Sequence, residues 1–115
     1  MFNRLFGRSG AGIPSVSPRE AWERYTSAPQ DVALIDVREA WEFSRGHAKG
    51  ARNIPLSQFS RRLNEVPANK DVLLICQSGH RSMQAAQILK ARGNERVTNI
   101  SGGTTIWRMS QLPME

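Results

Sequence analysis

The sequence has little of what disulfide frameworks, metal centres and membrane spans require. One cysteine stands among 115 residues, so no disulfide can form within the chain, which fits a reducing compartment and a cytoplasmic location. The two histidines, His47 and His80, match no metal-ligand spacing, and we expect neither a metal nor another cofactor. No segment approaches the roughly 20 apolar residues of a membrane-spanning helix, so no membrane contact is expected.

Acidic residues are also in the minority. The chain carries 16 Lys and Arg against 10 Asp and Glu, a formal net charge of +6 with neutral histidines. The basic residues are spread along the chain, with Arg61 and Arg62 as the only adjacent pair, and they lack the aromatic interleaving of nucleic-acid-binding proteins. The charge therefore favours small anionic substrates or acidic partners over nucleic acid.

The first 12 residues differ in character from the rest. Residues 1–12 are predicted to be a flexible tail, because they end in Ser-Gly-Ala-Gly and contain no long apolar run. For the same reason they do not read as a secretory signal. Residues 13–115 are long enough for one domain with a modest core.

Strands alternate with helices along this domain. Ser17, followed by Pro18 and Glu20, is typical of a capped helix start with a capping box, and Gly93 marks the end of a later helix. Apolar runs predict strands at 13–16, 31–37, 51–55, 72–75 and 97–100, and helical spacing predicts helices at 18–28, around 41–43, at 56–63, at 83–90 and after 103.

This alternation predicts an α/β fold with a central, mainly parallel sheet of about five strands and helices on both faces. In such sheets, ligands bind beyond the carboxyl ends of the strands. The polar segments 36–39, 76–82 and 101–103 each follow a predicted strand, so we expect them to meet at that edge.

The segment 76–82, Cys-Gln-Ser-Gly-His-Arg-Ser, is the candidate active loop. A short loop between a strand and a helix directs backbone N–H groups into one concavity, which binds anions and favours thiolate over thiol. A lone cysteine after an apolar strand is more often an ordinary core residue. Gly79, Arg81 and Ser82 beside Cys76 are hard to explain by packing alone, and we expect the sulfur to be open to solvent.

Five short pieces of sequence occur in order along the chain, and together they resemble the rhodanese-like family of sulfurtransferases from about Ser15 onward. The resemblance implies the rhodanese-like fold and a Cys76 persulfide, formed from thiosulfate or another donor and discharged to cyanide, a thiol or a sulfur-accepting protein. The pieces are 36–39 with 42–43, 46–47, 50–55, 76–82, and 102–103 with Trp107.

The resemblance also implies residue roles. Cys76 and Arg81 would be catalytic, with Arg81 supporting both the loop and the charge of the donor. The backbone amides of residues 77–82 would cradle the anion. The substrate-binding residues would be Gln77, Ser78, Gly79, His80 and Ser82. Apart from the resemblance, we expect Asp36 and Arg38 to form a buried or half-buried pair that braces the loop and takes no part in the chemistry.

Other interpretations stay open. A persulfide carrier or sensor that serves one protein partner would have the same loop, whereas a phosphatase or arsenate reductase-like enzyme is less expected, because phosphatases place five residues between cysteine and arginine and this chain has four. The remaining polar and aromatic residues have simpler expected roles. Glu39 and Glu42 are expected at the surface, His47 in a turn, and Trp41 and Trp107 in the core or a pocket wall.

Overall fold

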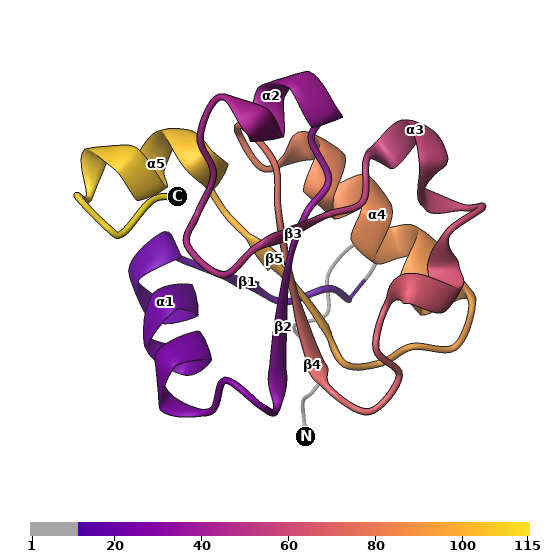
Figure 1. Ribbon diagram of the computed structural model, residues 1–115. Helices are drawn as coiled ribbons and strands as arrows, with labels where there is room; N and C mark the ends of the chain where they lie inside the picture. Colours follow the sequence, from indigo (N-terminus) through magenta and orange to yellow (C-terminus); the bar gives the residue numbers. More distant parts are fainter. Residues whose placement is uncertain (1–11) are drawn as a thin grey trace.

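The computed structural model describes residues 12–115, so the predicted tail, except for its last residue, lies outside the described residues. The elements alternate as the sequence predicts (Figure 1). The strands are β1 (Ser15–Val16), β2 (Val32–Asp36), β3 (Arg52–Asn53), β4 (Asp71–Ile75) and β5 (Val97–Ile100). The helices are α1 (Pro18–Ser27), α2 (Ala40–Ser44), α3 (Leu56–Phe59), the 3₁₀ turn η1 (Leu63–Glu65), α4 (His80–Ala91) and α5 (Gly103–Met109).

The five strands form one parallel sheet in the order β1-β5-β4-β2-β3, which confirms the predicted α/β fold. β4 lies at the centre, and its residues 72–75 are buried because helices cover both faces of the sheet. The register pairs Ile75 with Asp36, so the segments after β4 and β2 leave the sheet at the same edge. None of the helices in residues 12–115 is both long and apolar enough to cross a membrane.

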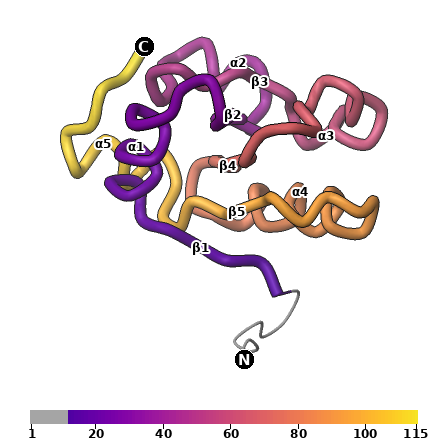
Figure 2. The backbone as a smooth tube through the Cα atoms, turned by 90° about the horizontal axis from the view of Figure 1, so that it is seen from below, coloured from indigo at the N-terminus to yellow at the C-terminus, as the bar shows by residue number. Residues whose placement is uncertain are grey.

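The helices make two layers, one on each face of the sheet (Figures 1 and 2). α3 and α4 pack Phe59, Ala85 and Leu89 onto one face. α1 and α5 cover the other face, where Trp107 is fully buried and packs edge-on against Trp22. α2 covers neither face but lies at the carboxyl edge of the strands, beside the start of α4 (Figure 1).

Two helix starts differ in detail from the prediction. Ser17 accepts a hydrogen bond from the amide of Glu20, but the Glu20 carboxylate binds Arg24 instead of completing the capping box. α4 begins at His80, three residues earlier than expected, because Gly79 adopts a left-handed conformation (φ +106°) that allows the helix to start there. The last three residues of the candidate loop therefore form the first turn of α4.

The predicted helix 56–63 is wrong. α3 ends at Phe59, and the amides of Arg61 and Arg62 then bond three residues back, to the carbonyls of Gln58 and Phe59. Leu56, Phe59 and Leu63 are three and four residues apart, which is α-helical spacing, but the chain forms tighter turns after Phe59.

Candidate active site

Cys76 lies in the middle of the carboxyl edge, because it directly follows the central strand β4. The chain then turns within three residues into α4. The position of the cysteine between a buried strand and a helix N-terminus is the one that the sequence predicts.

Polar hydrogens of the loop surround the Cys76 sulfur. The Gly79 amide donates to Sγ at 3.0 Å, and the Ser82 hydroxyl lies 3.3 Å from it. Burial by itself would raise the pKa of the thiol, but the Ser82 hydroxyl and the amides of Ser82, Gly79 and Ser78 outweigh it and lower the pKa below its ordinary value. The site therefore favours the thiolate.

The expectation that the sulfur is open to solvent is wrong. Cys76 is 1% exposed and belongs to the core cluster on the α4 face, with Val37, Leu74 and Ala85. It ends a strand that is buried on both faces, so its side chain starts from the core. Burial raises the pKa of the thiol in an ordinary apolar core cysteine. Cys76 differs from such a cysteine, because several hydrogen-bond donors contact its buried sulfur.

Asn99 is a member of the site that the sequence analysis missed. It lies on β5, is 4% exposed, and its Oδ1 is 2.6 Å from the Ser82 hydroxyl. That hydroxyl has one hydrogen and two acceptors within reach, Asn99 Oδ1 and Cys76 Sγ. A polar amide side chain within a short strand that is buried along its length was the signal that could have revealed Asn99.

Arg81 is tied to Glu42 of α2. Its two terminal nitrogens donate to the two Glu42 carboxylate oxygens at 2.7 and 3.0 Å, a two-pronged ion pair. The Arg81 guanidinium holds the pKa of Glu42 at about 2, against the opposing effect of burial. The expectation of a surface role for Glu42 is therefore wrong, since its side chain is 16% exposed and joins α2 to α4.

The predicted pair of Asp36 and Arg38 is present and almost fully buried. Arg38 donates to both Asp36 carboxylate oxygens at 2.8 to 3.1 Å and to the Gly46 carbonyl at 2.9 Å. Its remaining nitrogen lies 3.5 Å from the side-chain oxygen of Gln77. This pair links the ends of β2 and α2 to the residue after Cys76.

The start of α5 supports the loop from the other side. Thr104 donates to the Cys76 carbonyl through its amide at 2.9 Å and its hydroxyl at 3.0 Å, and the Thr105 amide donates to the Gln77 carbonyl at 3.2 Å. Gly103 has φ +54°, and any Cβ there would collide with both of those carbonyls. Gly103 thus permits α5 to approach the loop closely.

The remaining predicted residues differ in their surroundings. His80 and Ser78 are exposed, and the Ser78 hydroxyl is 3.4 Å from His80 Nδ1. His47 stacks on Phe43 and its Nδ1 lies 3.0 Å from the Phe43 carbonyl, which confirms its place in a turn. Trp41 is 62% exposed and lines a cavity of about 320 Å³ beside Gln77, so it is a pocket wall.

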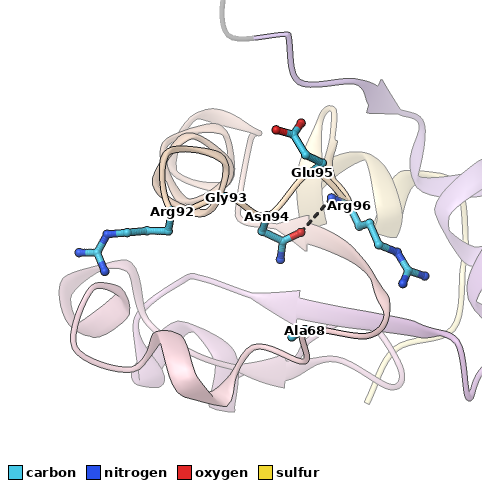
Figure 3. Close-up of a pocket in the computed structure, with 6 residues that line it drawn as sticks. All are labelled: Ala68, Arg92, Gly93, Asn94, Glu95 and Arg96. Carbon is cyan, nitrogen blue, oxygen red and sulfur yellow. Dashed lines mark hydrogen bonds between the residues drawn. The ribbon is translucent and has the colours of Figure 1, made fainter.

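A second cavity, of about 420 Å³, lies at the opposite end of the sheet (Figure 3). It is lined by Ala68 and residues 92–96, mostly exposed, and by none of the candidate site residues. Within residues 12–115, no group of three or more His, Cys, Asp or Glu side chains could hold a metal ion.

Comparison with known proteins agrees with the fold. The model of the rhodanese-like domain matches residues 17–110, which is most of the chain. The protein belongs to the rhodanese-like domain family.

Three curated relatives illustrate the range of the family. The chain is 46% identical over 85 residues to the uncharacterized protein YqhL of Bacillus subtilis (strain 168), covering 74% of this chain and 68% of YqhL. It is 33% identical over 99 residues to the putative sulfur carrier protein YrkF of the same strain, covering 86% of this chain and 53% of YrkF. It is 32% identical over 100 residues to the thiosulfate sulfurtransferase GlpE of Glaesserella parasuis serovar 5, covering 87% and 91%.

A solved structure shows the same fold. The rhodanese-related protein from Thermoplasma volcanium superposes with a TM-score of 0.79 at 24% identity, covering 90% of this chain and 98% of the other. This likeness concerns the fold alone.

Proposed function

We propose that the protein is a sulfurtransferase that moves sulfane sulfur from thiosulfate or a persulfide donor to a thiol or cyanide acceptor through a Cys76 persulfide. The observation that carries this proposal is the set of amide and hydroxyl donors directed at the Cys76 sulfur. The relative named thiosulfate sulfurtransferase GlpE supports it, because the similarity covers 87% of this chain.

The first half of the proposed reaction uses the thiolate as nucleophile. Cys76 attacks the outer sulfur of thiosulfate, a new S–S bond forms, and the bond between that sulfur and the sulfonate group breaks. The electron pair of the broken bond leaves with sulfite, so no external oxidant or reductant is needed. The persulfide product is again an anion, and the same donors stabilise it.

The second half returns the enzyme to its starting state. Cyanide or a thiolate attacks the outer sulfur of the persulfide, forms a bond to it, and the electron pair of the cysteine S–S bond returns to Cys76. Because the chain has a single cysteine, the acceptor must come from outside. We place the protein in the cytoplasm, where a reactive thiolate stays reduced.

Arg81 is proposed to act mainly as a positioning residue. Both of its terminal nitrogens are bound to Glu42, so the pair fixes α2 against the first turn of α4. Because Glu42 neutralises the charge of Arg81, the backbone amides are the chief groups that bind the donor anion. Asp36 and Arg38 brace Gln77 from the opposite side of the loop.

A second candidate is a persulfide carrier that delivers sulfur only to a protein partner. The burial of Cys76 favours a carrier, since a sulfur with 1% exposure is protected from nonspecific acceptors. The relative named as a putative sulfur carrier is consistent with it.

Steady-state formation of thiocyanate from thiosulfate and cyanide tests the proposal and separates the two candidates. Sustained turnover that is lost in Cys76→Ser supports the enzyme. A single slow discharge of a stable persulfide supports the carrier, and turnover that survives in Cys76→Ser contradicts both.

A further inference from the structure

The cavity beside the active loop has an unusual lining. Its volume is about 320 Å³, and it lies between α2 and α5. One of its lining residues, Gln77, directly follows Cys76 in the chain. We call it the arginine pocket. Its lining residues are Arg38, Trp41, Glu42, Arg45, Gln77 and Arg108.

Some of the charges in the arginine pocket are already neutralised. Arg38 is paired with Asp36, and Glu42 is paired with Arg81, both at 2.7 to 3.1 Å. Arg45 and Arg108 differ, because neither has a carboxylate within 4.0 Å in the part of the chain that the structure describes. The pocket therefore has two guanidinium groups, both on exposed residues, that form no salt bridge within residues 12–115.

These two guanidinium groups reach the pocket from different elements. Arg45 follows α2 and lies over the ring of Trp41, with its central carbon 5.3 Å from the ring centroid. Arg108, on α5, packs against Gly46, where an added Cβ would be 2.9 Å from its Nη2. Gly46 is the chain neighbour of Arg45, so Arg108 packs against the segment that carries Arg45.

The ligand must also be small. Cys76 is 1% exposed, so an acceptor needs a slender sulfur end to reach its persulfide. A cavity of about 320 Å³ is at the lower end of the roughly 300–1,000 Å³ of small-molecule sites. Two separate guanidinium groups match two carboxylates, since each can bind one with charge-assisted hydrogen bonds.

We propose that the arginine pocket binds the two carboxylates of a small dicarboxylate thiol, which receives the sulfur from Cys76. This inference rests on the proposed function and specifies its acceptor. The acceptor thiolate attacks the outer sulfur of the Cys76 persulfide, a bond forms between those two sulfur atoms, and the Cys76 S–S bond breaks. The Cys76 thiolate is regenerated, the acceptor leaves as a persulfide, and no co-reactant is consumed.

The test compares two thiols on the full chain preloaded with thiosulfate and freed of excess donor. Mercaptosuccinate carries two carboxylates, and 2-mercaptoethanol carries none. We expect the double variant Arg45→Gln/Arg108→Gln to slow discharge to mercaptosuccinate about tenfold, with less than a twofold change for 2-mercaptoethanol. The matched control, Arg61→Gln/Arg92→Gln, removes the same charge from exposed positions outside the pocket and should change neither rate.

Equal slowing of both thiols by the pocket variant, or equal slowing of mercaptosuccinate by the control variant, would overturn the proposal. A separate measurement tests the dicarboxylate site independently of the proposed sulfurtransferase activity. Calorimetric titration of Cys76→Ser with succinate should show binding that Arg45→Gln/Arg108→Gln weakens about tenfold, whether or not sulfur chemistry occurs. Absence of succinate binding would contradict the proposed dicarboxylate site. Failure of the wild-type chain to take up sulfur would contradict only the proposed catalytic role of Cys76.

Discussion

Arg81 and Glu42 are 39 positions apart, yet two hydrogen bonds of 2.7 and 3.0 Å join their side chains between α4 and α2. The pair fixes the first turn of α4, which supplies the Ser82 groups that contact the Cys76 sulfur. A short helix at the edge of the sheet thus takes part in shaping the active loop.

Replacing Glu42 by Gln should destabilise the protein at neutral pH. The variant leaves the partly buried Arg81 guanidinium without a charged partner, at a cost of about 1–3 kcal/mol. Urea unfolding at neutral pH measures this difference.

The same difference should depend on pH. The pKa of Glu42 is about 2 in the folded chain and has its ordinary value of 4.5 in the unfolded chain, so the carboxylate stabilises the fold fully above pH 4.5. The stabilisation is lost as the pH falls from 4.5 towards 2, and the unfolding free energies of the native chain and Glu42→Gln should converge there. A difference that persists unchanged at pH 2 would show that packing, not charge, is responsible.

Replacing Arg81 by Ala should slow sulfur loading and leave the fold intact. If Arg81 acts through Glu42, the double variant Arg81→Ala/Glu42→Gln should load no more slowly than Arg81→Ala alone, because both remove one interaction. Independent, multiplying effects would indicate that Arg81 contacts the donor directly. Circular dichroism serves as the control for folding.

Replacing Ser82 by Ala should raise the pKa of Cys76, because the hydroxyl that lowers it is removed. We expect the thiol of the variant to titrate at higher pH, since a hydrogen bond to the charged form of a group favours that form. The ultraviolet absorbance of the thiolate, measured against pH with Cys76→Ser as the blank, reports the change. Asn99→Ala should move the same titration, whereas Thr98→Val, on the opposite side of β5, should not. An unchanged titration in Ser82→Ala would exclude the hydroxyl as a stabilising group.

Replacing Gly103 by Ala should destabilise the fold by about 2 kcal/mol or more, because the new Cβ would collide with the Cys76 and Gln77 carbonyls. Gly93→Ala is the matched control, since Gly93 also has a positive φ (+95°) but nothing within 4 Å of an added Cβ. Equal losses in the two variants would mean that backbone strain alone, and not the close approach of α5, makes Gly103 necessary.

The sequence was sufficient for the fold and for the location of the loop, because both depend on short-range patterns. The apolar run 72–75 and the glycine three residues after Cys76 define a strand, a turn and a helix without reference to the rest of the chain. The buried pair of Asp36 and Arg38 could also be predicted from the sequence, since its members are two positions apart.

What the sequence did not reveal depends on contacts between distant segments. Glu42 looks like any surface carboxylate until α2 is placed beside α4, and Asn99 looks like a strand residue until Ser82 is placed opposite it. The burial of Cys76 has the same origin, because it follows from helices that cover the end of β4 on the α4 face.

The most direct test of the central claim is the intact mass of the protein after treatment with thiosulfate, compared between the native chain and Cys76→Ser. The account predicts a gain of one sulfur atom on the native chain and no gain on the variant. No gain on the native chain, or an equal gain on both, would contradict it.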